Sequence, residues 1–471
     1  MMTLLQASKW VSASQLVGDG KVQIKRVHTD TRSLLPGDLF VALTGDNFDA
    51  NDFLAQAQTQ GAVAAIGQHG LKATGLPGLV VTDSKMALGQ LAAGWRSQFD
   101  LPLVAVTGSN GKTTVTQMIA SILRAYRQDH AFATQGNLNN DIGVPLTLLR
   151  LTSDHKIGVV ELGMNHPGEI AYLSNITQPT VALVNNAQRE HLEFMGTVEA
   201  VAHENGAVID SLGAKGVAVF PADDDYTSVW RKKAGARTML TFAITGDADV
   251  TADAQWTDAG WHVTAATPKG ALTFTLNIAG KHNVKNALAA TACALAAGVS
   301  LEYISAGLSG FEPVKGRSRA VLIHSKNHHL TLIDDTYNAN PDSMRAAIDV
   351  LAALPGPRLL VMGDMGEVGD QGPQFHQEAG LLARTRGIES LYSLGAQSKL
   401  ASSSFGGGQH FDDIDALNAV VLAQLPSLRS VLIKGSRFMK MERVVQAITS
   451  LQEQQEKQKQ QEEQQKRGAT C

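Results

Sequence analysis

The chain has 471 residues, of which 44% are hydrophobic and 18% are charged, and its formal net charge is −4. That length predicts about two to four domains, and the slightly acidic balance excludes the basic surface typical of nucleic-acid binding. The two cysteines, Cys293 and Cys471, have no metal-binding spacing and form no disulfide framework, which indicates a reducing compartment. Residues 1–14 show no signal-peptide pattern and no apolar run has membrane-spanning length, so we expect a cytoplasmic protein that is not membrane-embedded.

Three α/β units and a tail follow one another along the chain. Residues 1–85 predict a small N-terminal unit of short strands and helices. Residues 86–313 alternate buried strands with helices, which predicts a central parallel sheet covered on both faces, with a small antiparallel excursion at residues 248–278. Residues 314–451 repeat the pattern as a C-terminal Rossmann-like unit. The polar tail, residues 452–471, is expected to be disordered or helical.

The predicted elements are recognised by short apolar runs for strands and by longer amphipathic stretches for helices. The predicted strands, in chain order, are residues 22–24, 37–43, 62–66, 79–82, 104–106, 158–161, 181–185, 217–220, 263–265, 272–276, 330–333, 358–362, 390–393 and 430–433. The predicted helices include residues 52–61, 85–98, 115–123, 283–297 and 441–451.

The most informative segment joins predicted strand 104–106 to the helix that follows it. It reads Thr107, Gly108, Ser109, Asn110, Gly111, Lys112, Thr113 and Thr114. A strand, a glycine loop ending in Lys-Thr and a helix are typical of P-loop proteins, whose backbone N–H groups and helix N-terminus hold phosphate. Lys112 can reach the β- and γ-phosphates, and the Thr113 hydroxyl can bind Mg²⁺. Only Ser109 and Asn110 separate the glycines, fewer than in the strict motif, and the alternative is an ordinary strand-to-helix turn.

Two further strands of the central unit are followed by side chains that can bind a cation. Glu161 ends predicted strand 158–161, and His191 follows predicted strand 181–185. Open α/β sheets bind ligands at the carboxyl ends of their strands, and a carboxylate beside a P-loop would hold Mg²⁺. The alternatives are a helix-capping or surface role for Glu161 and a surface or packing role for His191.

Other polar segments are candidates for binding a nucleotide or a polar substrate. Residues 135–145 contain three Asn, one Asp and two Gly, a composition typical of loops with unusual backbone angles. In the third unit, residues 334–341 leave a strand with two adjacent aspartates, and residues 434–437 place two cations beside a glycine. Arg317 can reach back toward the central unit. The alternative for each segment is a solvated loop.

Together these segments resemble the Mur ligase family, the ATP-dependent amide ligases that build the peptidoglycan stem peptide. The resemblance covers nearly the whole chain except the tail. Residues 107–114 look like the ATP loop of the family, which accounts for the short glycine spacing, and residues 27–33 look like its nucleotide-sugar-binding segment. Residues 334–341 and 434–437 are similar to those of the member that joins D-alanyl-D-alanine to UDP-N-acetylmuramoyl-tripeptide.

The resemblance implies ATP as co-substrate, Mg²⁺ as cofactor, a monomer, and roles for individual residues. Lys112 would stabilise the γ-phosphate during its transfer, while Thr113, Glu161 and His191 would bind two Mg²⁺ ions; Lys112, Glu161 and His191 are the catalytic set. The other ATP-binding residues would be Thr107, Gly108, Ser109, Asn110, Gly111, Thr114, Asn283, Asn286, Arg317 and Asp335. The substrate-binding residues would be Thr31, Arg32 and Ser33 for the uridine diphosphate, Asn137 and Asn139 for the rest of that nucleotide, and Asn338, Asn340, Lys434 and Arg437 near the second substrate.

One position departs from the family. Most members carry a carbamylated lysine that helps hold the second Mg²⁺, and counting fourteen positions from His191 places it at Asn205, which cannot be carbamylated. The hypothesis is that Glu204 or Asn205 supplies an oxygen ligand, because Mg²⁺ favours hard oxygen donors. The alternative is a helix shift that lets water fill the place.

The chemistry that the resemblance implies is amide formation through an acyl phosphate. A stem-peptide carboxylate attacks the γ-phosphate, ADP leaves, and the amine of D-alanyl-D-alanine then displaces phosphate. Domain closure would bring Arg317 and Asp335 to the ATP, so Asp335 is allowed to lie far from Lys112 in an unliganded structure. The alternatives are the ligase that adds the third stem residue, a folate polyglutamate ligase, a nucleotide-gated binding or regulatory module, and a simple kinase.

Overall fold

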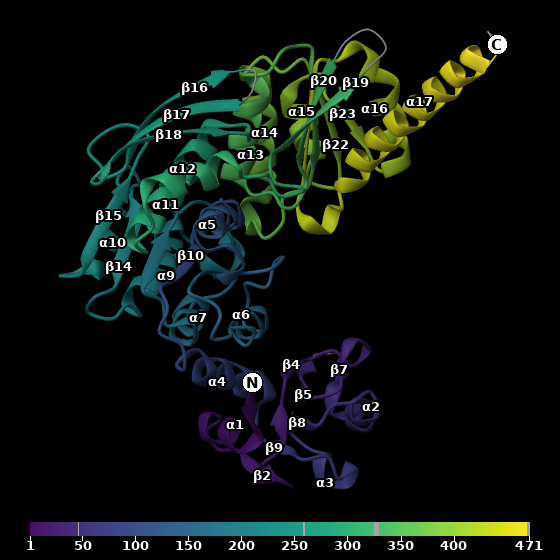
Figure 1. Cartoon of the computed structure of the whole chain (residues 1–471). Helices are drawn as coiled ribbons and strands as arrows, with labels where there is room; N and C mark the ends of the chain where they lie inside the picture. The colour runs from purple at the N-terminus through teal and green to yellow at the C-terminus, as the bar shows by residue number, and fades with distance from the viewer. Residues whose placement is uncertain (46, 258–259, 325–328, 469–471) are drawn as a thin grey trace.

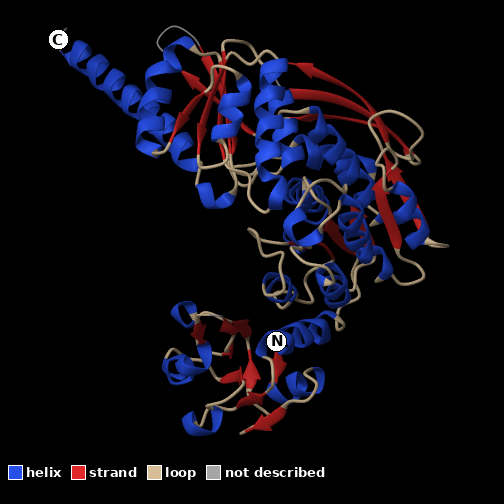
Figure 2. Cartoon of the chain, turned by 180° about the vertical axis from the view of Figure 1, so that it is seen from behind, coloured by secondary structure: helices blue, strands red, loops and turns tan. Residues whose placement is uncertain are grey.

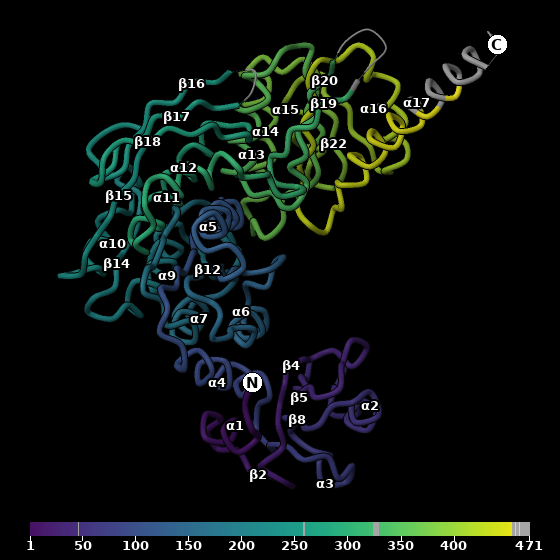
Figure 3. The backbone as a smooth tube through the Cα atoms, viewed as in Figure 1, coloured from purple at the N-terminus to yellow at the C-terminus, as the bar shows by residue number. Residues whose placement is uncertain are grey.

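The computed structural model describes residues 1–45, 47–257, 260–324 and 329–468, and three sheets dominate it (Figure 1). The N-terminal unit lies at one end of the molecule, and helix α4 (Ser84–Arg96) joins it to the central unit. The C-terminal unit packs beside the central unit on the far side (Figure 3). The last helix, α17 (Glu442–Gly468), begins packed on the C-terminal unit and its far end projects away from the body, so the part of the polar tail that is described is helical.

The N-terminal unit contains a five-stranded sheet of order β2-β9-β8-β5-β4, parallel except for β2. Its strands are β2 (Gln15–Val17), β4 (Arg26–His28), β5 (Asp38–Val41), β8 (Ala64–Gly67) and β9 (Gly78–Val80). Two small antiparallel pairs flank it: β1 (Met2–Thr3) with β3 (Gln23–Ile24), and β6 (Thr44–Gly45) with β7 (Phe48–Asp49). Its helices are α1 (Leu4–Trp10), α2 (Leu54–Thr59) and α3 (Leu71–Thr74), with 3-10 turns at Thr31–Ser33 and Ala50–Phe53.

Helix α4 starts at Ser84 because the Asp83 side chain accepts hydrogen bonds from the N–H groups of Lys85 and Met86. The helix contacts α1 of the N-terminal unit and helices α6 (Gly143–Leu148) and α7 (Glu169–Thr177) of the central unit. Leu88 and Leu91 on α4 are fully buried in a hydrophobic core that the two units share. The helix is therefore a packed connection rather than a free linker.

The central unit is built on a six-stranded, all-parallel sheet of order β11-β12-β10-β13-β14-β15. Its strands are β10 (Leu103–Thr107), β11 (Ala131–Ala133), β12 (Ile157–Glu161), β13 (Val181–Val184), β14 (Val217–Pro221) and β15 (Thr238–Phe242). The remaining helices are α5 (Lys112–Arg127), α8 (Leu192–Met195), α9 (Val198–Asp210), α10 (Thr227–Ala234), α11 (Lys281–Ala296) and α12 (Leu301–Ser309), with a 3-10 turn at Gln128–His130. Helices cover both faces of the sheet, as Figure 2 shows.

A three-stranded antiparallel sheet of β16 (Thr251–Thr257), β17 (Gly260–Thr267) and β18 (Gly270–Leu276) extends the central unit. Alternate side chains of these strands, such as Val263, Phe274 and Leu276, are buried in the core beneath α5 and α11. The excursion predicted at residues 248–278 is therefore confirmed.

The C-terminal unit has a six-stranded sheet of order β19-β20-β24-β21-β22-β23. Only the pairing of β19 with β20 is antiparallel within this sheet. The strands are β19 (Arg319–His324), β20 (His329–Asp335), β21 (Arg358–Gly363), β22 (Ser390–Leu394), β23 (Gln409–Phe411) and β24 (Ser430–Lys434). Besides α17, its helices are α13 (Pro341–Ala352), α14 (Gly372–Thr385), α15 (Lys399–Phe405) and α16 (Ile414–Gln424), with 3-10 turns at Gly369–Gln371, Leu425–Ser427 and Arg437–Met439.

The fold class predicted from the sequence is confirmed, and each predicted strand overlaps an observed one. The antiparallel edge strand β19 was not predicted, because its pairing with β20 is a tertiary contact that the local pattern does not reveal. The carboxyl ends of β10, β12 and β13 lie side by side in the central sheet, so the loops that leave them meet at one edge.

Candidate active site

A cavity of about 1270 Å³ lies between the carboxyl edge of the central sheet and the C-terminal unit. Most of the predicted site residues line it, although they come from segments far apart in the sequence. Those residues are Ser109, Asn110, Gly111, Lys112, Thr113, Thr114, Asn137, Asn139, Glu161, His191, Asn283, Asn286, Arg317, Asp335, Asn338, Asn340, Lys434 and Arg437. The central and C-terminal units are therefore already together, and Asp335 shares one cavity with Lys112.

The phosphate loop connects β10 to α5, as predicted. Gly111 precedes the helix with φ of 80°, and a Cβ there would lie 2.6 Å from Asn286 Oδ1, so both the backbone angle and the space require glycine. The first turn of α5, from Lys112, supplies N–H groups that have no partner within the helix. These features fit an anion held at a helix N-terminus.

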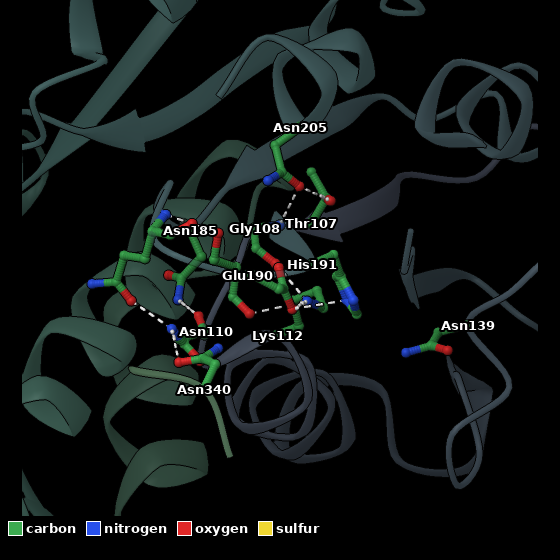
Figure 4. Close-up of polar contacts among 12 residues, drawn as sticks. Thr107, Gly108, Asn110, Lys112, Asn139, Asn185, Glu190, His191, Asn205 and Asn340 are labelled. Carbon is green, nitrogen blue, oxygen red and sulfur yellow. Dashed lines mark hydrogen bonds and ion pairs between the residues drawn. The ribbon is translucent and has the colours of Figure 1, made fainter. Parts of the chain in front are cut away.

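Lys112 folds back onto its own loop (Figure 4). Its Nζ donates hydrogen bonds to Gly108 O at 2.6 Å, Ser109 O at 3.1 Å and the Glu190 carboxylate at 2.8 Å. The two carbonyl groups and the carboxylate thus take the places that phosphate oxygens would occupy around this cation.

The loop after β13, residues 185–188, supports the phosphate loop from the side. Asn185 Nδ2 donates to Asn110 O at 2.7 Å, and Asn186 Oδ1 accepts from Asn110 N at 2.8 Å. Gln188 N donates to Ser109 Oγ at 2.9 Å. Sequence reasoning did not single out these amides, because Asn and Gln after a strand are also common in ordinary turns.

Glu161 and Thr113 lie together at the carboxyl end of β12. Thr113 Oγ1 donates to Glu161 Oε1 at 3.1 Å, and Asn139 Nδ2 donates to the same oxygen at 2.8 Å. Glu161 is only 1% exposed, and no described residue donates a hydrogen bond to its Oε2 atom. The surface alternative for Glu161 is therefore excluded, and an unpaired buried carboxylate oxygen beside a threonine hydroxyl fits a bound cation.

His191 lies between two carboxylates. Its Nδ1 is 2.6 Å from Glu367 Oε2 of the C-terminal unit, and its Nε2 is 3.5 Å from Glu190 Oε1. Burial lowers the pKa of the imidazole, but the hydrogen bonds to Glu190 and Glu367 outweigh burial and raise the pKa to about 9. A metal ion at His191 would have to displace that proton.

Asn205 lies on α9, directly behind the phosphate loop and fully buried. Its Oδ1 accepts hydrogen bonds from Thr107 Oγ1 at 2.6 Å and from Gly108 N at 2.9 Å. Glu204 faces elsewhere, and its carboxylate accepts from Gly168 N and Ile170 N at the start of α7. Neither side chain lines the cavity: Asn205 anchors the phosphate loop and Glu204 caps α7, and a metal-binding role for either residue stays a prediction.

The C-terminal unit reaches the phosphate loop at several points. Arg317 Nη2 donates to Thr113 Oγ1 at 3.0 Å, and Asn340 Nδ2 donates to Asn110 Oδ1 at 2.9 Å. Lys434 Nζ donates to Asp335 Oδ2 at 2.6 Å; burial would raise the pKa of Asp335, but Lys434 lowers it. Of the residues expected to arrive on domain closure, Arg317 therefore contacts the phosphate loop and Asp335 lines the same cavity.

A further ion pair, not predicted from the sequence, joins the same two units. The Arg189 guanidinium contacts Asp342, which lies in the first turn of α13, at 2.8 to 3.2 Å. Arg189 Nη1 also donates to Glu378 on α14 at 3.0 Å. In the sequence, the only indication of this contact was the charge of Arg189, two positions before His191. Its partners Asp342 and Glu378 become apparent only in the folded structure.

The predicted uridine-diphosphate residues lie in the N-terminal unit, on the 3-10 turn Thr31–Ser33. Arg32 pairs with Asp30 and is exposed, and Ser33 Oγ is 2.7 Å from His28 Nε2. None of the three lines the cavity, so their role in binding stays a prediction.

Comparison with known proteins finds matches along most of the chain. Three family models match: "Mur ligase family, catalytic domain" over residues 23–96, "Mur ligase middle domain" over residues 106–294, and "Mur ligase, glutamate ligase domain" over residues 318–437. The chain is 42% identical over 431 residues to the UDP-N-acetylmuramoyl-tripeptide--D-alanyl-D-alanine ligase of Escherichia coli, covering 91% of this chain and 94% of that protein.

Solved structures agree with the sequence relatives. A crystal structure of MurF from Acinetobacter baumannii has a TM-score of 0.87 and 37% identity, covering 95% of this chain and 98% of that chain. MurF ligase from Thermotoga maritima in complex with ADP has a TM-score of 0.81 and 26% identity, with 92% of this chain and 98% of that chain covered. The chain belongs to the Mur ligase family, whose members form amide bonds with the use of ATP.

Proposed function

We propose that this protein joins D-alanyl-D-alanine to UDP-N-acetylmuramoyl-tripeptide, with ATP converted to ADP and phosphate, for peptidoglycan synthesis. The proposal is supported by the relatives that carry this activity in their names over more than nine tenths of the chain. The structural observation that carries it is the single cavity in which the phosphate loop meets Arg317 and Asp335 of the C-terminal unit.

In the proposed complex, ATP lies between the central and C-terminal units. The loop of residues 107–114 holds the phosphates, Asn283 and Asn286 lie near the adenine, and Arg317 and Asp335 contact the nucleotide from the C-terminal unit. Both amides are buried at the start of α11; Asn286 lies beside Gly111, and its Nδ2 donates to Asn283 Oδ1 at 2.9 Å. A structural neighbour solved with ADP agrees with nucleotide binding in this fold.

Mg²⁺ fits the donor set at the carboxyl end of β12. Thr113 and Glu161 would hold one ion, because the two side chains are 3.1 Å apart and Glu161 Oε2 is unpaired among the described residues. His191 would contribute once its proton has left. No group of three or more His, Cys, Asp or Glu in the described chain forms a preassembled cage, which agrees with Mg²⁺ bound largely by nucleotide phosphates. When bound, Mg²⁺ neutralises the charge on the phosphoryl oxygens.

The reaction proceeds through an acyl phosphate. The stem-peptide carboxylate attacks the γ-phosphate and ADP leaves, while Lys112 moves from its loop carbonyls onto the phosphoryl oxygens, where its charge stabilises the transition state. The loop N–H groups and Arg317 hold the phosphates in line with the attacking oxygen. Closure of the C-terminal unit over the cavity keeps water from the acyl phosphate until the amine of D-alanyl-D-alanine attacks.

The proposal gives each unit one task. Residues 1–85 bind the uridine diphosphate through Thr31, Arg32 and Ser33, residues 86–313 bind ATP, and residues 314–451 close over it. Asn137 and Asn139 contact the rest of the nucleotide substrate, and Asn338, Asn340, Lys434 and Arg437 lie near D-alanyl-D-alanine. The enzyme acts as a cytoplasmic monomer without nucleic-acid partners. Among the described helices, none is both long and apolar enough to cross a membrane.

Phosphate release tests the proposal. Release should require ATP, UDP-N-acetylmuramoyl-tripeptide and D-alanyl-D-alanine together, and Lys112→Met should abolish it. Lys232→Met, at an exposed site on α10, is the matched control and should leave the rate unchanged. Phosphate release at the full rate without D-alanyl-D-alanine would show a nucleotide switch instead of a ligase.

A further inference from the structure

Two buried carboxylates in the cavity each have one oxygen without a partner. Glu161 is 1% exposed and Glu190 is 8% exposed, and both line the cavity. The Oε1 atoms are occupied, but no described residue donates a hydrogen bond to either Oε2. Burying an unpaired carboxylate oxygen is costly, so each of these atoms points to a ligand that the protein itself does not supply.

The negative charge of Glu190 is balanced by Lys112 in this structure, and nucleotide binding at the proposed site would disturb that balance. Its neutralising partner is Lys112, at 2.8 Å between Oε1 and Nζ, and both side chains are largely buried. When a nucleotide binds, Lys112 turns toward the phosphates. Glu190 then keeps only the longer contact to His191, at 3.5 Å, beside further negative charge, and losing the close partner of a buried charge is unfavourable. The place that Lys112 leaves beside the unpaired Glu190 Oε2 atom is one that a cation can fill.

We propose that Glu190 is a ligand of a divalent cation that enters the site together with the nucleotide. This rests on the proposed binding of ATP between the central and C-terminal units. Glu190 Oε1 lies 3.5 Å from His191 Nε2, so the two side chains already converge on one point in the cavity. The nucleotide supplies the remaining oxygens, because Mg²⁺ commonly binds through one or two carboxylates and substrate phosphates.

The neighbouring oxygen atoms that could bind a cation already accept hydrogen bonds from the protein. Asn205 Oδ1 already accepts two hydrogen bonds from the phosphate loop, and Glu204 caps α7 through two backbone N–H groups. Glu190 is the carboxylate that combines burial, an unpaired oxygen and contact with both Lys112 and His191. The competing explanation is that Glu190 does no more than position Lys112.

Binding of Mn²⁺ with ADP separates the two explanations, since it can be followed by electron paramagnetic resonance without any turnover. Glu190→Gln keeps the shape and an oxygen that accepts from Lys112, but it removes the charge. We expect Glu190→Gln to weaken Mn²⁺ binding in the presence of ADP by about tenfold or more, and to leave ADP binding in excess chelator unchanged or tighter. Glu193→Gln, an exposed carboxylate on the next turn, is the matched control and should match the unaltered protein.

Two results would overturn the proposal. One is Mn²⁺ affinity in Glu190→Gln equal to that of the unaltered protein. The other is an equal loss of ADP binding with and without metal, which would show that Glu190 only positions Lys112. If Glu190→Gln does not fold, Glu190→Ala tests the same point: weaker Mn²⁺ binding with ADP, at unchanged ADP binding in excess chelator, supports the proposal, and unchanged Mn²⁺ binding overturns it. The measurement uses no amine substrate. It can therefore be interpreted even if D-alanyl-D-alanine proves not to be a substrate.

Discussion

The contact between Arg189 and Asp342 should control how tightly the nucleotide is bound, because it joins the two units that enclose the cavity. Three guanidinium contacts to Asp342 lie between 2.8 and 3.2 Å, and Arg189 N donates to Asp342 Oδ2 at 2.8 Å. The side chains are 20% and 15% exposed. Burial would raise the pKa of Asp342, but the hydrogen bonds from Arg189 lower it, so the pair is charged.

The expected magnitude lies between two limits. An exposed ion pair contributes about 0 to 1 kcal/mol, whereas removing one partner of a buried pair costs about 3 to 5 kcal/mol. A bidentate pair that is mostly buried should therefore contribute about 2 kcal/mol to the closed arrangement. Since 1.4 kcal/mol is tenfold in an equilibrium constant, this corresponds to roughly 30-fold in nucleotide affinity if the closed arrangement is the one that binds.

Calorimetric titration with ADP measures this effect directly. Arg189→Met and Asp342→Asn should each raise the Kd for ADP by roughly 10- to 30-fold. The loss in the double variant should be clearly smaller than the sum of the two, because both remove the contact between Arg189 and Asp342, although Arg189→Met also removes the contact with Glu378. Arg345→Met is the matched control. Arg345 also approaches Asp342, at 3.7 Å, but it is 57% exposed, so its loss should change the Kd by less than about twofold.

The reasoning would be refuted by additive losses in the double variant, or by single variants with an unchanged Kd. Additive losses would mean that Arg189 and Asp342 act through different partners. An unchanged Kd would mean that the nucleotide is bound by the central unit alone, without help from closure of the C-terminal unit.

Three further predictions concern the neighbourhood of the phosphate loop. Asn205→Leu removes two buried hydrogen bonds and should lower the free energy of unfolding by about 1 to 3 kcal/mol in chemical denaturation, whereas Asn205→Asp keeps the acceptor and should lose less. Because an amide cannot be carbamylated, depleting bicarbonate should not slow phosphate release; a slower rate would reveal a carbamate on a lysine elsewhere. His191 has a raised pKa, so its stabilising contribution should be complete below its unfolded pKa of about 6.5 and disappear as the pH rises through about 9. In His191→Gln the free energy of unfolding should therefore decrease less between these two pH values than in the unaltered protein. The same decrease in both proteins would contradict the raised pKa of His191.

Local sequence patterns determined most of the architecture and the centre of the site. Apolar runs ending at Glu161 and before His191 marked strands whose carboxyl ends meet, because parallel strands of one sheet share an edge. The glycine spacing around Lys112 predicted the phosphate loop, since the positive φ at Gly111 is a requirement of the local backbone. These features depend on residues that are neighbours in the chain, so the sequence displays them directly.

The tertiary structure decided which distant segments meet. Arg189 and Asp342 are 153 residues apart in the sequence, and Asn110 and Asn340 are 230 apart, yet both pairs are in hydrogen-bond contact. The fold also brought Asn205 into hydrogen-bond contact with the phosphate loop. No local pattern encodes such contacts, because they depend on how two separately folded sheets pack against each other. The sequence therefore determined the parts of the site, and long-range packing determined their arrangement.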